Sequence, residues 1–364
     1  MPPLGDPGPH RRRFEEEARE EFCQRLYELG VVVLTHPPDG SRYSSVFLDE
    51  GGCLHNRKEA LEVQLMASRL ELPFHRSSAN LLFSTLPVSD RKSLRTFTDF
   101  RKAVSQSPVP PEDSPVSNAR LLNQPRRVTD ADPRSVFPYR GAESDALAHL
   151  RHYLSSPERV HSYKATRNRL LGIDDSSKLS PFLATGALSV RAVWSELLRF
   201  EQEHGVSDGT EWLKFELLWR EYFRWLELDS GETFYSPGGS RGVLPPPSTE
   251  DRELFLKWTR GETGIPFIDA NLRELNLTGF MSNRGRQNVA SHFIHELCLP
   301  WWWGADYFSK MLVDSDPAQN YGNWSYLAGV GADPRSFGGQ ARKFDLVRQV
   351  REYDPDGEYQ RTWL

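Results

Sequence analysis

The sequence predicts two unlike parts, a small α/β layer built on a parallel sheet over residues 1–104 and a larger all-α bundle over residues 140–364. Short β-branched runs alternate with helical periodicity only near the N-terminus, and that alternation is typical of a parallel sheet. Beyond residue 140, apolar residues recur at helical spacing, interrupted by Gly and Pro, and strand alternation is absent. Residues 105–139 are rich in Pro, Ser, Asp and Asn, which predicts an extended linker draped over the surface.

The N-terminal part is expected to begin with a helix and to continue into two or three strands. Residues 12–30 carry apolar residues at helical spacing and end at a glycine, a common helix terminator. The runs 31–36 (VVVLTH) and 45–50 (SVFLDE) predict strands, residues 56–71 fit a second helix, and 73–78 (PFHRSS) is a candidate third strand. These elements are too few for a complete doubly wound, Rossmann-like domain, so we expect a shortened one.

Composition and charge exclude several classes of protein. The formal net charge is −5 at pH 7, so contact with nucleic acid must come from a local basic patch rather than from the chain as a whole. Cys23, Cys53 and Cys298 lie far apart without metal-type spacing, which argues against a disulfide framework. No run approaches the roughly 18 apolar residues of a membrane span, and no targeting signal is recognised. We therefore expect a soluble intracellular protein of the cytoplasm, the nucleus or an organelle.

The segment 211–228 (EWLKFELLWREYFRWLEL) is apolar on almost every face, so we expect a helix that is buried on most sides. Glu216, Arg220 and Arg224 recur every four residues and form one charged stripe along it. The pattern alone leaves two interpretations open. The stripe is either a solvated row of helix salt bridges or the lining of a polar ligand cavity, because buried charge is costly unless it is paired or used.

Two later segments carry polar residues where a core helix would be apolar. In 278–297, Asn283 and Arg286 share one helix face, with a glycine between them that permits close approach. The two histidines that follow are interpreted as structural, because no third metal ligand is near them. In 312–333, acidic and amide side chains gather beside a tryptophan: Asp314, Asp316, Asn320 and Trp324. An Asp-x-Asp pair suits a metal loop and a helix cap equally, and no calcium loop of EF-hand type fits. We predict no metal site.

The segment 163–191 contains a turn rich in hydroxyls before a helix. Ser176, Ser177 and Ser180 surround Lys178, and such a turn at a helix N-terminus suits a phosphate group. An ordinary N-cap explains the same residues equally well. The residue pattern therefore predicts a helical domain with a polar pocket and leaves its ligand open.

Four stretches together carry a resemblance to a known family: YKATRN…SSKLSPFLATG, WLKFELLWREYFR, GIPFIDANLRELNLTGFMSNRGRQNVAS and DSDPAQNYGNWSYLAGVG. In this order and spacing they resemble the FAD domain of the photolyase/cryptochrome family, and LTGFMSNRGRQNVAS and NYGNW resemble its cryptochrome-DASH branch. The resemblance runs from about residue 140 to the C-terminus. It identifies the bundle as a FAD-binding catalytic domain, residues 1–104 as a truncated antenna domain, and residues 105–139 as the interdomain linker.

The resemblance implies FAD bound in a U-shape, with the protein tuning a cofactor that performs the difficult chemistry. Asn320 would face the flavin N5, Arg286 would pair with Asp314, and Asp316 would border the flavin and ribose. The residues implied to hold the cofactor are Tyr163, Ser176, Ser177, Leu179, Ser180, Arg220, Asn283, Arg286, Asp314, Asp316 and Asn320.

The reaction implied by the resemblance is the light-driven splitting of cyclobutane pyrimidine dimers by an electron from FADH⁻. Glu216 would hydrogen-bond the lesion carbonyl and stabilise its radical anion. Trp219 and Tyr326 would be the walls between which the flipped lesion stacks. Residues implied to contact DNA are Arg167, Arg284, Gln287, Arg342 and Lys343. Tyr326 and Gln287 accompany a preference for single-stranded DNA in that branch. RNA is a further candidate partner, and we expect a monomer.

Two features depart from the family pattern. The first strand of the family and its WFR-type motif are not found, so we expect a compromised site for a methenyltetrahydrofolate antenna and no tight antenna binding. In the family's tryptophan relay, Trp324 and Trp301 match the inner and middle members. The outer position falls at Ser248, which cannot carry the hole, and Trp258, Trp302 or Trp303 stay open as substitutes.

These departures keep two functions in view, with slower photoreduction expected in either. The first is a deoxyribodipyrimidine photolyase-type lyase, which the complete lesion pocket favours. The alternative is a flavin blue-light photoreceptor or nucleic-acid-binding signalling protein with little or no repair. A product that retains only flavin binding is a third reading.

Overall fold

The computed structural model describes residues 6–28, 46–49, 63–69, 71, 73–77, 80–83, 85–86, 94–110, 122–333 and 341–364. Most of these residues form helices. None of the described helices is long and apolar enough to cross a membrane.

Two short strands pair in the N-terminal part. β1 (Val46–Asp49) and β2 (Phe74–Ser77) run parallel in the register Val46↔Phe74 to Asp49↔Ser77. Between them, residues 63–69 are helical, which completes a strand–helix–strand order. The strands expected at 45–50 and 73–78 are thus confirmed, while the run at 31–36 lies outside the described residues. Membership of these strands in an antenna-type domain stays a prediction.

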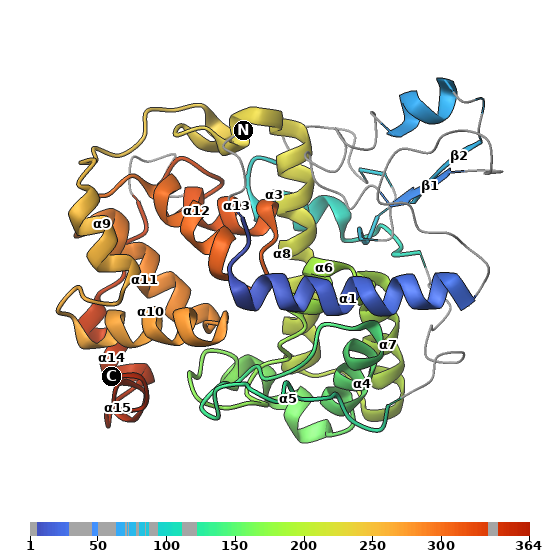
Figure 1. Cartoon of the computed structure of the whole chain (residues 1–364), viewed down its shortest axis with the longest axis horizontal. Coiled ribbons are helices and arrows are strands. Elements are labelled where there is room, and N and C mark those ends of the chain that lie inside the picture. Colours follow the sequence, from blue (N-terminus) through green and yellow to red (C-terminus); the bar gives the residue numbers. More distant parts are fainter. Residues whose placement is uncertain are drawn as a thin grey trace.

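The first helix, α1 (Pro9–Glu28), lies where the sequence could not place it. It packs against α4 (Glu143–Leu154) and α12 (Trp301–Met311), both of the helical part. Figure 1 shows it crossing the bundle, apart from β1 and β2. Phe14 is fully buried, 5.7 Å from the ring of Phe137 and 5.5 Å from that of Phe182. We expected this helix to belong to the N-terminal layer, but its core contacts are with the bundle.

Helices account for the regular structure described beyond residue 140, as the sequence predicts. The central helix is α8 (Asp208–Ser230), which begins with a capping box between Ser207 and Thr210. The other helices are α3 (Phe97–Val104), α5 (Pro157–Thr166), α6 (Ser180–Thr185), α7 (Val190–His204), η3 (Gly231–Tyr235), η4 (Gly239–Arg241), α9 (Arg252–Thr259), α10 (Pro266–Thr278), α11 (Asn283–His295), α13 (Pro317–Leu327), α14 (Leu346–Tyr353) and α15 (Glu358–Trp363).

The α8 helix is buried on most sides, as its apolar composition predicts. It packs against α5, α13, α7 and α3. Glu221 on this helix is fully buried, and its carboxylate accepts hydrogen bonds from the backbone N–H groups of Leu82 (2.9 Å) and Phe83 (3.2 Å). Glu221 thereby ties residues 80–83 to the bundle, because a buried carboxylate requires such donors.

The linker prediction needs a correction at its C-terminal end. Residues 122–139 are described, and an antiparallel bridge joins Arg127 to Tyr139. Val136, Phe137 and Tyr139 are buried in the main core rather than lying on the surface. Apolar side chains at the end of this polar stretch contribute to the core because they flank the start of α4.

Candidate functional site

Two adjoining cavities open beside α8, with volumes of about 280 Å³ and about 630 Å³. We call them the first and the second cavity. They share a wall of polar and charged side chains: Arg167, Glu216, Arg220, Asn283, Arg286, Asp314, Asp316 and Gln319.

The residues predicted from sequence divide between these cavities. Five of them line only the first cavity: Tyr163, Ser176, Ser177, Leu179 and Ser180. Seven line only the second cavity: Trp219, Arg284, Gln287, Asn320, Trp324, Tyr326 and Arg342. Trp301 and Lys343 line neither. The fold therefore brings together segments that lie up to about half the chain apart.

The serine turn is built around a buried lysine. Lys178 adopts a positive φ of 46°, and its ammonium donates to the carbonyls of Gly172 (2.7 Å) and Ile173 (2.6 Å). Burial lowers the pKa of Lys178 to about 8, against the raising effect of nearby aspartates. The N-cap of α6 is Leu179, which makes no side-chain cap bond, so the neighbouring hydroxyls do not serve as an ordinary N-cap there. This leaves them facing the first cavity.

The charged stripe of α8 is not a solvated row of salt bridges. Arg224 pairs with Asp316, and both side chains are 3% exposed. Arg220 donates to the carbonyl oxygens of Asn80 (2.9 Å) and Leu183 (3.3 Å). Glu216 accepts from Arg167 and from the indole nitrogen of Trp212 (3.0 Å). Glu216 and Arg220 line the cavities, whereas Arg224 is buried in its pair with Asp316 and lines neither, so the cavity interpretation holds for two of the three stripe residues.

Burial and charge pairing shift the pKa values of this stripe. Burial lowers the pKa of Arg220 to about 9, assisted by repulsion from Arg224. Burial alone would raise the pKa of Asp316, but Arg224 and Arg220 hold it below its ordinary value. Burial raises the pKa of Glu216, only partly opposed by Arg167 and Trp212. The two carboxyl groups of the shared wall are thus shifted in opposite directions, the pKa of Asp316 downwards by its arginines and that of Glu216 upwards by burial.

Opposite α8, the start of α11 and the segment before α13 complete the shared wall. The expected pairing of Arg286 with Asp314 is present at 2.9 Å, and Ser180 donates to the same carboxylate at 2.7 Å. The other carboxylate oxygen of Asp314 is buried without a partner. A buried acceptor of this kind suits a hydrogen-bond donor from a ligand.

The start of α11 depends on a glycine. A Cβ atom on Gly285 would lie 2.0 Å from the side-chain oxygen of Asn271 on α10. The close approach inferred from the sequence is therefore present. It places Asn283 and Arg286 against the shared wall.

Asn320 is oriented by α12. Its side-chain amide nitrogen donates to the Ala305 carbonyl and to the Ser309 hydroxyl, both at 2.7 Å. The amide plane at this edge of the second cavity is therefore held by two acceptors.

Aromatic side chains form the outer part of the second cavity. The rings of Trp219 and Tyr326 lie edge to face with centroids 6.0 Å apart. Phe97 of α3 stacks on Trp219 at 3.8 Å, a contact that the sequence analysis missed. The sequence analysis assigned no role to the segment that contains Phe97. Its aromatic residue was the available signal.

The tryptophans implied in electron transfer are both buried. Trp324 packs within 5.2 Å of the Phe308 ring and 6.5 Å of the Trp258 ring. The ring of Trp301 meets Trp302 at 6.1 Å and Tyr321 at 6.2 Å. Ser248 is exposed, whereas Trp258 is fully buried and is therefore no surface exit.

The cationic residues implied in DNA binding are not all alike. Arg167 and Arg284 line the second cavity with Arg342, and the Arg284 guanidinium lies 4.6 Å above the Tyr353 ring. Lys343 instead pairs with Glu296 at 2.7 Å on the exposed surface. The cationic rim thus comes from the three arginines.

Comparison with known proteins agrees with this geometry. Residues 212–364 match the FAD binding domain of DNA photolyase. The chain is 42% identical to a cryptochrome DASH of Synechocystis over 382 residues, which cover 98% of this chain and 77% of that protein. It is 43% identical to cryptochrome DASH of Danio rerio over 284 residues, which cover 74% of this chain and about half, 53%, of the relative.

A solved structure has the same fold. The crystal structure of a Synechocystis cryptochrome superposes with a TM-score of 0.86 at 33% sequence identity, covering 98% of this chain and 78% of that one.

Proposed function

Because this chain belongs to the cryptochrome DASH family, we propose that it is a light-driven lyase that splits cyclobutane pyrimidine dimers in single-stranded DNA. The observation that carries the proposal is the position of Glu216. It stands in the wall shared by the two cavities, between the residues suited to a cofactor and those suited to a flipped pyrimidine dimer.

The residues of the first cavity fit FAD, the cofactor of a photolyase-type FAD-binding domain. Three serines line it, and one buried carboxylate oxygen of Asp314 has no hydrogen-bond partner within the protein. The second cavity, about 630 Å³, falls within the roughly 300–1,000 Å³ usual for ligand sites, and the first, about 280 Å³, lies just below that range. When bound, FAD supplies light absorption and the transferable electron.

The residues of this chain would hold and orient that cofactor. We propose that Tyr163, Ser176, Ser177, Leu179 and Ser180 contact its phosphates and ribityl chain. Arg220, Asn283, Arg286, Asp314, Asp316 and Asn320 would surround the flavin. The buried Arg224–Asp316 pair keeps this wall rigid, because neither charge can leave its partner without losing its compensation.

Glu216 would act on the lesion. When protonated, the Glu216 carboxyl can donate a hydrogen bond to a pyrimidine carbonyl, and burial, which raises its pKa, makes that form more accessible than in an exposed glutamate. That bond strengthens as negative charge develops on the lesion, which is how a placed donor lowers a barrier. Trp219 and Tyr326 would stack against the two bases, and such stacking contributes about 1–3 kcal/mol per base.

The DNA contacts would come from Arg167, Arg284, Gln287 and Arg342 at the rim of the second cavity. A lesion must leave its stack to enter, and unstacking is least costly in a single strand. Single-stranded RNA presents the same backbone and base faces and is the natural competitor to test. Lys343 does not line the second cavity and pairs with Glu296 on the exposed surface, so its contact with DNA stays a prediction.

A substitution at Glu216 tests the assignment. Glu216→Ala is expected to reduce light-driven dimer repair in a single-stranded oligonucleotide by about a hundredfold to a thousandfold, the loss typical of one charge-stabilising donor. Glu211→Ala is the matched control, because Glu211 is exposed on the first turn of the same helix. Both variants should retain FAD absorbance. Equal repair by both would refute the assignment.

One observation favours the photoreceptor alternative. Phe97 covers one face of Trp219 by stacking at 3.8 Å, and that face would otherwise be open to a base. A FAD-loaded protein that binds the oligonucleotide but repairs nothing in light, and that gains repair in Phe97→Ala, would establish this alternative.

A further inference from the structure

The helix α1 reaches both walls of the cofactor site from outside it. At its N-terminal end, Gly8 N–H donates to the Lys310 carbonyl at 2.8 Å. One turn later the Arg11 guanidinium donates to the Ser309 carbonyl and to the Ser315 hydroxyl (3.3 Å). Ser315 lies between Asp314 and Asp316, so this end of α1 is tied to the flavin side of the site.

The other end of α1 caps α4. The N-cap residue of α4 is Ala142, which has no side chain able to accept a hydrogen bond. Glu21 supplies the missing acceptor, because its carboxylate accepts from the backbone N–H of Ser144 (2.8 Å) and from its hydroxyl (2.6 Å). Glu17 accepts from the N–H of Gly141 at 2.8 Å. Negative charge at a helix N-terminus is favourable, so α1 provides both cap and counter-charge.

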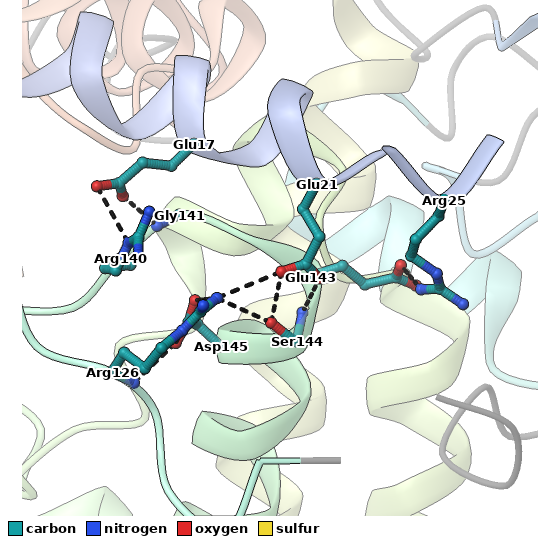
Figure 2. A network of polar contacts seen from close by, with 9 residues as sticks. All are labelled: Glu17, Glu21, Arg25, Arg126, Arg140, Gly141, Glu143, Ser144 and Asp145. Carbon is teal, nitrogen blue, oxygen red and sulfur yellow. Dashed lines mark hydrogen bonds and ion pairs between the residues drawn. The ribbon is translucent and has the colours of Figure 1, made fainter. Parts of the chain in front are cut away.

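A network of arginines reinforces this second attachment (Figure 2). Arg126 bridges Glu21 (3.3 Å) and the buried Asp145 of α4 (2.7 Å), and Arg25 at the end of α1 pairs with Glu143. The α4 helix contributes Leu150, Tyr153 and Leu154 to the first cavity. The ring nitrogen Nε2 of His149, on the same helix, lies within hydrogen-bond distance of the Ser177 carbonyl oxygen, at 2.8 Å. This end of α1 is therefore tied to the phosphate side of the site.

The Arg11 contact continues to the edge of the second cavity through one residue. The carbonyl of Ser309 is held by Arg11, and the hydroxyl of the same residue accepts from the Asn320 amide. Ser309 itself is buried. A shift of Arg11 would therefore move Ser309 and, through its hydroxyl, the Asn320 side chain that is proposed to face the flavin N5.

We propose that α1 is a clasp that holds the two walls of the FAD site together, and that Arg11 is a positioning residue for Asn320. The proposal rests on FAD as the cofactor and not on the reaction. Opening either attachment lets the walls separate and releases the cofactor. Opening the Arg11 attachment also changes the environment of the flavin itself.

Paired variants on the same helix test the clasp. Glu17→Ala/Glu21→Ala removes the carboxylates that cap α4, and Arg11→Ala removes the guanidinium contacts to Ser309 and Ser315. Glu16→Ala/Glu20→Ala and Arg12→Ala alter exposed neighbours. Alanine preserves helix propensity in all four. The two attachment variants should release FAD about tenfold faster after dilution, a coupling of ordinary size between separated contacts. Release at the rate of the controls would overturn the clasp.

A second readout separates positioning from general loosening. Arg11→Ala and Ser309→Ala should each shift the midpoint potential of the bound flavin, and their double variant should shift it no further, because both act through one contact. Glu17→Ala/Glu21→Ala should leave the potential unchanged. An unshifted potential in Arg11→Ala would refute the role of Arg11. Failure of the proposed repair function is distinguishable, since wild-type protein would then hold FAD tightly and repair nothing.

Discussion

The ion pair between Arg224 and Asp316 gives the most quantitative prediction of this structure. Both side chains are 3% exposed, and they join the central helix to the N-terminus of α13. Asp316→Asn removes the charge but retains the size and the capping oxygen, since asparagine and aspartate are N-caps of similar strength. The variant leaves the Arg224 charge without its carboxylate, a change that costs about 3–5 kcal/mol in buried pairs.

The assay is denaturant unfolding of the wild type and the variant, with Asp345→Asn as the matched control. Asp345 is the exposed N-cap of α14 and accepts from Arg348 N–H at 3.1 Å, so the same substitution there changes a cap without a buried pair. The control should lose less than about 1 kcal/mol. Equal losses in both proteins would refute the reasoning that the buried pair stabilises this wall.

Three further predictions follow from other parts of the site and core. Burial raises the pKa of Glu274 from 4.5 to about 8. Its favourable contribution to the stability of the fold is therefore complete below pH 4.5 and is lost as the pH rises towards 8. In thermal melts, Glu274→Gln should flatten the curve of stability against pH over that window. Gly285→Ala should destabilise the protein by about 1–3 kcal/mol through overpacking against Asn271 and lower FAD occupancy, whereas an unchanged melting temperature would contradict the close contact. Ser248→Trp should accelerate flavin photoreduction under blue light with a reductant. Residue 248 is exposed beside Thr249, whose N–H donates to the Cys298 carbonyl (2.7 Å) near Trp301. An unaltered rate would show that another residue already carries electrons between the surface and Trp301.

Local patterns predicted those features that depend on neighbours in sequence. The α8 segment is apolar on nearly all faces, so its burial and the cost of its charges followed directly. The strands β1 and β2 were visible from their composition, and the close packing at Gly285 from a glycine inside a helical pattern. The ligand and the role of each residue came from the resemblance, because residue types alone fitted a phosphate turn and an N-cap equally.

Features that depend on distant partners could not be predicted. Arg224 and Asp316 are separated by 92 positions, and no local signal links them. The periodicity of α1 predicted a helix but not its partner, and so placed it with the N-terminal layer instead of the bundle. Phe97 and Glu221 have ordinary sequence surroundings. Only the fold stacks Phe97 on Trp219 and brings the Glu221 carboxylate to the backbone N–H groups of residues 82 and 83. Long-range packing thus decided what the pattern left open.

The most direct test of the central claim is repair by the intact, FAD-loaded protein. A single-stranded oligonucleotide with one cyclobutane pyrimidine dimer is mixed with the protein whose flavin has been chemically reduced, and dimer content is followed in blue light and in darkness. The account predicts loss of the dimer in light only, at a rate above that of the same lesion in a duplex. A dimer that persists in light, with FAD bound and the oligonucleotide in complex, would contradict it.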